Sequence, residues 1–229
     1  MSIVAVGLYF VPLLIVIIKK LWSQRAFRLF SLYWLISALV NVVEFIPLPR
    51  ETAMSFTVVY NMVDIPLVLG IICYITTSTL IKKVLKVAIP LILVAELISF
   101  GVYGFRYESL KYAMGGSLVL ILVILVYEIV SKLQKIRIAG ADKGMLLIYA
   151  ALFFEYGTYV VIYIFDYFLP NVSSITDSWL VYYLSSIIAL SVAICGFLVK
   201  GVDGSVQETT DAYETKGVRQ LELGLRYWE

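Results

Sequence analysis

Residues 59–74 read VYNMVDIPLVLGIICY, an apolar stretch with one carboxylic acid, one proline and no lysine or arginine. It lies within a longer apolar run, 55–81, which exceeds the roughly 20 residues that a helix needs to cross a bilayer core. Lipid offers no hydrogen-bond partners to an open backbone, and barrel strands alternate over about ten residues. The run therefore predicts a membrane-spanning helix.

Six further apolar runs occur along the 229 residues. Hydrophobic residues make up 62% of the chain and its mean hydropathy is +0.95, whereas soluble domains are about 45–50% apolar. We expect an all-α polytopic membrane protein, with a transmembrane domain over 1–200 and a tail over 201–229. Its seven predicted spans are 3–21, 29–48, 55–81, 84–104, 110–131, 144–168 and 176–199.

Basic residues are distributed unevenly between the two sides of this domain. The loops after the first, third and fifth spans, and the tail, are rich in lysine and arginine, whereas the opposite loops contain Arg50, Arg106 and Lys111. Cytoplasmic loops carry the positive excess. We therefore expect the N-terminus outside and the C-terminus in the cytoplasm.

Two segments 122 residues apart resemble each other. VYNMVDIPLVLGIICY (59–74) aligns with VYYLSSIIALSVAICG (181–196), so that Tyr60 matches Tyr182. This similarity predicts a parallel repeat of spans one to three in spans five to seven, with span four as a linker. The alternative is chance similarity between apolar segments.

In helix number, direction and length, the chain resembles the three-plus-one-plus-three membrane proteins, which include the SWEET sugar transporters, the PQ-loop transporters, the PnuC vitamin transporters and the microbial rhodopsins. It lacks their signature motifs, since Leu13 follows Pro12 where the first two families have glutamine or asparagine. Retinal is excluded as a cofactor, because span seven has no lysine at its middle. The YNMVD segment (60–64) is similar to uncharacterised bacterial seven-helix proteins, which implies a bacterial inner membrane.

Carboxylic acids within the spans are the candidate functional groups. An aspartate at the centre of a spanning helix costs about 2.5–3.5 kcal/mol, and such residues usually have a function. At about 1.5 Å per residue, Asp64, Glu96 and Glu155 lie at similar depths near the midplane, and Glu44 lies closer to the outer surface. No lysine or arginine occurs at these depths.

Polar residues accompany these acids at helical spacing, which places each set on one face of its span. The sets are Ser37, Asn41 and Glu44; Asn61 and Asp64; Glu155, Tyr159, Tyr163 and Asp166; and Tyr182, Ser185 and Ser186. We expect these faces to meet in an outward-opening polar cavity. The expected ligand-binding residues are Asn41, Glu44, Asn61, Asp64, Glu96, Glu155, Tyr159, Ser185 and Ser186.

Pro66 follows Asp64 by two residues. Because proline cannot donate to the carbonyl of Met62, we expect a kink there and treat Pro66 as a hinge. The alternative is that proline is simply frequent in membrane helices.

The acids allow two interpretations. They could be protonated and bonded to neighbouring spans as structural links, or they could bind a proton, a cation or an amine-bearing ligand. The second predicts a transporter or binding protein for a small polar or cationic solute. The alternative function is a receptor or signalling subunit that couples an outer ligand to a cytoplasmic partner.

Other functions lack the residues that they need. The chain has no histidine, the commonest metal ligand and general base, and Cys73 and Cys195 form no ligand cluster. We therefore expect no metal, no cofactor and no enzyme activity. A net charge of +2 gives no reason to expect nucleic acid as a partner, and nothing in the sequence sets an oligomeric state.

The tail begins with a polar, acidic stretch that is typical of flexible segments. Its last part, VRQLELGLRYWE (218–229), alternates apolar and polar residues. This pattern predicts a strand-like segment that binds a cytoplasmic protein. The alternative is adhesion to the membrane surface.

Overall fold

A computed structural model describes residues 2–43, 45–104, 107–134, 140–168 and 175–199. All regular structure in these residues is helical. A 3-10 turn, η1, covers Leu21–Ser23. The α-helices are α1 (Ser2–Ile18), α2 (Arg25–Val43), α3 (Arg50–Ile75), α4 (Thr79–Tyr103), α5 (Tyr107–Leu133), α6 (Gly140–Phe168) and α7 (Ile175–Leu198).

The helices have the lengths and compositions of membrane spans. Among the described residues, α2 to α7 each contain a segment long and apolar enough to cross a membrane, whereas α1 has 17 residues and is shorter. Large apolar side chains also face outward, such as Leu91, Leu97 and Val102 on α4. Apolar surface of this extent marks a partner or a membrane, and the helix composition makes this a multi-pass membrane protein.

Several helix ends differ by a few residues from the predicted spans, and the largest difference lies between the third and fourth spans. The predicted third span ran to residue 81 and the fourth began at 84, but α3 ends at Ile75 and α4 begins at Thr79. The backbone at Thr76 and Ser78 is extended, and the Ser78 hydroxyl accepts a hydrogen bond from the Ile81 amide at 3.3 Å, as an N-cap does. Hydropathy missed this turn because the apolar run continues on both sides of it.

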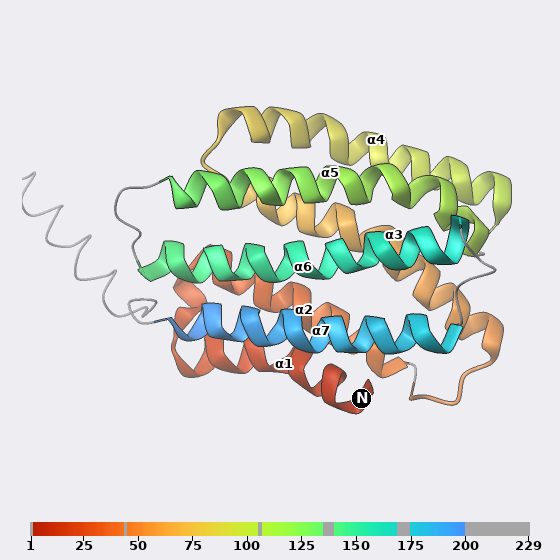
Figure 1. The fold of residues 1–229 in the computed structure, drawn as a ribbon, viewed down its shortest axis with the longest axis horizontal. Helices are drawn as coiled ribbons and strands as arrows, with labels where there is room; N and C mark the ends of the chain where they lie inside the picture. The colour runs from red at the N-terminus through yellow and green to blue at the C-terminus, as the bar shows by residue number, and fades with distance from the viewer. Residues whose placement is uncertain (1, 44, 105–106, 135–139, 169–174, 200–229) are drawn as a thin grey trace, which may run out of the picture.

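The packing pairs of the described helices close a ring of six, and α4 lies outside it, at one edge of the bundle in Figure 1. Around the ring α1 packs against α2, α2 against α3, α3 against α5, α5 against α6, α6 against α7, and α7 against α1. The remaining helix, α4, packs against α3 and α5. The ring order is unchanged if the set α1, α2 and α3 is exchanged with the set α5, α6 and α7. A parallel repeat with a linker helix would have this order.

The end of the bundle where α1, α3, α5 and α7 finish is called here the basic end (left in Figure 1). Two lysines connect helices there. The Lys19 ammonium donates to the carbonyls of Phe197 at 3.4 Å and Val199 at 3.5 Å, which joins α1 to the end of α7. Lys132 on α5 forms an ion pair with Asp142 on α6 at 2.8 Å.

Two glycines bring α6 and α7 close together near the basic end. A Cβ atom added at Gly144 would lie 2.6 Å from the Gly196 carbonyl oxygen, and one added at Gly196 would lie 2.7 Å from the Gly144 carbonyl oxygen. Real Cβ contacts of this length essentially never occur. The absence of a side chain at both positions therefore permits direct backbone contact, as small residues do in membrane helix pairs.

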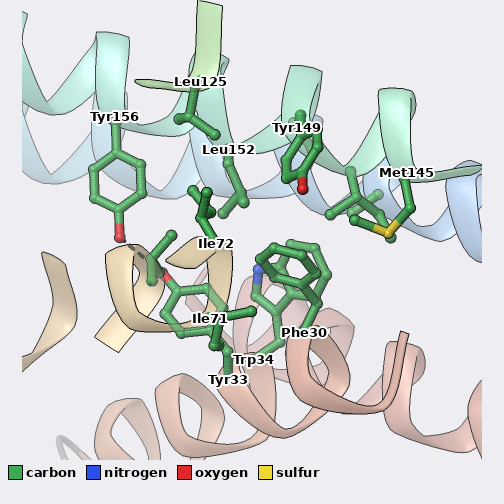
Figure 2. Close-up of a cluster of buried hydrophobic side chains, with 14 of the residues drawn as sticks. Phe30, Tyr33, Trp34, Ile71, Ile72, Leu125, Met145, Tyr149, Leu152 and Tyr156 are labelled. Atoms are coloured by element: carbon green, nitrogen blue, oxygen red, sulfur yellow. Dashed lines mark hydrogen bonds between the residues drawn. The ribbon is translucent and has the colours of Figure 1, made fainter. Parts of the chain in front are cut away.

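An apolar layer fills the ring interior on the basic-end side of its middle. Figure 2 shows Phe30 and Trp34 of α2, Ile72 of α3, and Tyr149 and Leu152 of α6 facing one another. All five are essentially fully buried. These five residues are called the apolar layer below.

Candidate functional site

Asp64 lies in the middle of α3 and points into the ring, where it is 6% exposed. The Tyr33 hydroxyl on α2 donates to Asp64 Oδ1 at 3.0 Å, and the Tyr156 hydroxyl on α6 donates to Oδ2 at 2.8 Å. The two hydroxyl oxygens lie 3.3 Å apart (Figure 2, dashed line). Both oxygens of this carboxyl group are therefore bonded by phenols from two other helices.

Glu155 is the residue before Tyr156 on α6, and it faces α1 and α7. The Tyr9 hydroxyl lies 3.1 Å from Glu155 Oε1 and 3.2 Å from Ser186 Oγ, so its single proton can be donated to either. The Tyr159 hydroxyl lies 3.5 Å from the same Oε1. Glu155 Oε2 is buried and has no hydrogen-bond partner among the described residues.

The two acids belong to one site, because Glu155 is directly followed on α6 by Tyr156, whose hydroxyl bonds Asp64. Adjacent positions on α6 make this arrangement: Glu155 turns to one side of the ring interior, and Tyr156 turns to the other side to reach Asp64. We call the following residues the central site: Tyr9, Tyr33, Asp64, Glu155, Tyr156 and Ser186.

A second layer of tyrosines lies about one helical turn from the acids, on the side away from the basic end. Tyr60 donates to Ser37 Oγ at 2.8 Å, and Tyr182 donates to Asn41 Oδ1 at 3.4 Å. The Tyr159 and Tyr182 rings stack, with centroids 5.8 Å apart and planes 12° apart. Tyr60, Tyr159 and Tyr182 are called the tyrosine layer below. The acids thus lie between the tyrosine layer and the apolar layer.

Several predicted site residues come together in this region. Asp64, Glu155, Tyr159 and Ser186 are joined as described above, and Asn41 contacts the tyrosine layer. Ser185 bonds to the Tyr182 carbonyl of its own helix at 2.8 Å. The predicted cavity that opens outward stays a prediction.

Other predicted residues lie apart from the central site. Tyr163 faces α5, where its hydroxyl donates to the Lys111 carbonyl and lies against Gly115. Asn61 is half-buried on α3, and its side chain makes no hydrogen bond within the described residues. Pro66 lies within a continuous α3, so its role as a hinge remains a prediction. Glu44 and the tail, 201–229, lie outside the described residues.

Glu96 on α4 is buried, at 1% exposure, but it does not join the central site. Neither of its carboxyl oxygens has a hydrogen-bond partner in the part of the chain that the structure describes. The sequence predicted a depth similar to that of Asp64 and Glu155, but depth alone does not say which side of a helix a residue faces.

Sequence reasoning missed three tyrosines of the central site: Tyr9, Tyr33 and Tyr156. A signal existed for Tyr33, because it lies four residues before Ser37 and thus extends the polar face of Ser37 and Asn41. Tyr156 follows an acid directly and so falls on a different face from Glu155. The helical spacing of four residues from Glu155 predicted Tyr159 as its polar neighbour instead.

A further buried acid, Glu128 on α5, lies toward the basic end. Although it lies near the end of α5, it is buried, at 6% exposure. Its carboxyl group accepts a hydrogen bond from the Thr76 hydroxyl in the α3–α4 turn. That turn, absent from the sequence-based boundaries, supplies the partner.

The chemistry available at the central site is that of two carboxyl groups and phenol hydroxyls. No group of three or more His, Cys, Asp or Glu side chains that could hold a metal occurs among the described residues. Carboxyl and hydroxyl oxygens are nevertheless good partners for a proton, an ammonium group or a hard cation. The fold and site define a multi-pass membrane protein with paired acids inside its helix ring.

Comparisons of this chain with family models, with curated proteins and with solved structures found no match.

Proposed function

We propose that this protein is a membrane transporter for a small cationic or polar solute, with Asp64 and Glu155 as its binding residues. One observation carries the proposal. Two acids from α3 and α6 share a buried site, and neither is bonded to a lysine or arginine within the described ranges.

The charge balance of the site supports a cationic occupant. Transferring an unpaired carboxylate into an apolar interior costs many kcal/mol, far more than a neutral hydrogen bond returns. The phenols donate hydrogen bonds, but they bring no positive charge. Each acid must therefore be neutralised by a proton or by a bound cation, and exchange between these two occupants would couple solute movement to proton movement.

The bonds to the acids also link the two sets of helices that a parallel repeat would define. Tyr156 on α6 bonds Asp64 on α3, and Tyr9 on α1 bonds Glu155 on α6. A cation that binds the acids would compete with these hydroxyl donors. Occupancy of the site would thereby loosen the contact between α1–α3 and α5–α7, as alternating access requires.

Barriers on both sides of the acids fit the same proposal. On the basic-end side lies the apolar layer, and on the other side the Tyr159 and Tyr182 rings stack beside Glu155. With the N-terminus outside, as the basic loops indicate, the tyrosine layer would be the outer barrier. The structure would then correspond to a state closed on both sides.

The test is a flux assay with the full-length protein in proteoliposomes. The panel contains alkali cations, ammonium, small amines and polar neutral solutes, and a pH-sensitive dye inside the vesicles reports proton movement. We expect saturable uptake that Asp64→Asn and Glu155→Gln abolish. Ser191→Ala is the matched control, because Ser191 is exposed on α7 and bonds only its own helix, at Ile187.

A deletion separates transport from signalling. Removing residues 205–229 should leave uptake intact in a transporter, whereas a signalling subunit would lose its cytoplasmic partner. Absence of flux for every solute, together with capture of a cytosolic protein that depends on the tail, would refute the transport proposal and support the receptor alternative.

A further inference from the structure

Glu96 is an anomaly that the proposed transport site does not use. It is 1% exposed, and both of its carboxyl oxygens lack hydrogen-bond partners among the described residues. Central-site acids differ in this respect, since phenols donate to both Asp64 oxygens and to Glu155 Oε1. A carboxyl group with no donor at either oxygen is poorly suited to carry a negative charge.

The surroundings of Glu96 are apolar. It lies on α4, whose main packing partners in the described part of the chain are α3 and α5. One turn further along α4, Phe100 packs with Val58 and Met62 of α3 and Met114 of α5. Ser99, on the same side of α4, donates its hydroxyl proton to the Ser109 carbonyl at 2.6 Å. This proton is therefore not available to Glu96.

In the described part of α3, α4 and α5, no charged side chain bonds Glu96, because neither of its carboxyl oxygens has a hydrogen-bond partner there. On α3, Asp64 and Tyr60 are engaged in the ring interior. On α5, the Glu128 carboxyl is bonded to Thr76, and the Lys111 ammonium lies over the Phe168 ring at 5.3 Å.

We propose that Glu96 is a second proton-binding site, separate from the central site, and that its loss of a proton displaces α4 from α3 and α5. An ionised Glu96 would be an unpaired charge in an apolar contact, which a buried position tolerates only by moving toward water or a counter-ion. Because α4 lies outside the ring, it can shift without opening the ring itself. The bound proton thus holds the linker helix in place.

The first experiment is infrared spectroscopy of the full-length protein in lipid bilayers near neutral pH. A protonated carboxyl group has a C=O stretch at higher frequency than amides and ionised carboxylates. We expect this band to weaken by one group in Glu96→Gln and to shift in Glu96→Asp. The band should be unchanged in Asp142→Asn, because the Asp142 carboxylate forms an ion pair with the Lys132 ammonium at 2.8 Å.

The second experiment follows hydrogen–deuterium exchange of α4 as the pH is raised. The wild-type chain should lose protection in α4 relative to Glu96→Gln measured at the same pH, which cancels the intrinsic pH dependence of exchange. Protection of α6 should stay the same in both chains.

Three outcomes would overturn the proposal. They are an acid band that is identical in wild type and Glu96→Gln, an acid band that appears only after alkali cations are removed, and equal α4 protection in the two chains at every pH. The second outcome would identify a metal cation as the occupant. None of these measurements uses solute flux, so their failure is distinct from failure of the transport proposal.

Discussion

The contact between Gly144 and Gly196 gives a sharp stability prediction. In Gly144→Ala the new methyl group would lie 2.6 Å from the Gly196 carbonyl oxygen and 3.0 Å from Phe27 Cζ. The nearest atom belongs to the backbone of α7, which cannot rotate away as a side chain could. Helices α6 and α7 must therefore separate locally.

The expected magnitude follows from two opposing effects. Overpacking a close contact costs about 1–3 kcal/mol, and the short distance to a backbone atom puts this site near the upper value. Replacing glycine by alanine inside a helix returns up to about 1 kcal/mol. We expect Gly144→Ala to lower the free energy of unfolding by about 1–2 kcal/mol.

A matched control lies on the same helix. A Cβ atom at Gly157 would meet no atom within 4 Å, so Gly157→Ala carries the helix-propensity gain without the clash. The two variants should differ by about 2–3 kcal/mol. Reversible unfolding in mixed detergent micelles measures this difference. Tryptophan fluorescence is the probe, because the Trp34 ring lies against Phe197 of α7.

Two results would refute the reasoning. If Gly144→Ala and Gly157→Ala have equal stabilities, the close contact does not exist. Once Gly144→Ala has separated α6 from α7, adding Gly196→Ala should lower the free energy of unfolding by less than it does alone. Full additivity in the double variant would therefore show that the two glycines do not share one contact.

Three further predictions concern the ring interior and the basic end. Tyr156→Phe should lower the free energy of unfolding by about 1–3 kcal/mol in the wild type but by less in an Asp64→Ala background, because it leaves a carboxyl oxygen unpaired only when the acid is present. Equal losses in the two backgrounds of a double-mutant cycle would contradict the hydrogen bond between Tyr156 and Asp64. Lys132→Asp and Asp142→Lys should each destabilise by up to about 1 kcal/mol, and the exchanged pair should recover part of it at low salt; unfolding titrations that find no recovery would speak against the ion pair. Leu152→Ala should cost about 2–5 kcal/mol through the cavity that it leaves and should speed dye-detected proton leak across proteoliposomes, and an unchanged leak would show that the apolar layer is not the barrier.

The sequence was most informative about the membrane spans, because lipid requires their backbone to be hydrogen-bonded within a helix. Apolar runs such as 55–81 located the helices, because an exposed backbone is not tolerated in hydrocarbon. Their ends were less predictable. The turn at Thr76–Ser78 depends on one hydroxyl cap, and a hydropathy average over many residues does not detect a single cap.

The sequence showed which acids are costly to place in a membrane span, but it did not show which side of the helix each acid faces. Asp64 and Glu155 stood out because an acid in a span is expensive, and both lie in the central site. Glu96 is equally costly in a span and has nearly the same expected depth, yet it lies on α4, which packs outside the ring. The tyrosines that bond the acids were missed, since tyrosine is not expensive in a span and only packing decides which rings reach a carboxyl group.

The length of α4 has a consequence for the surrounding lipid. Its 25 residues extend about 38 Å, whereas the hydrocarbon core of a typical bilayer is about 30 Å thick. Apolar side chains near both ends of the helix, Leu80 and Val102, face outward. We therefore expect α4 to tilt or to thicken the bilayer beside it. Such a mismatch would enrich longer acyl chains along the edge of the bundle that α4 forms in Figure 1.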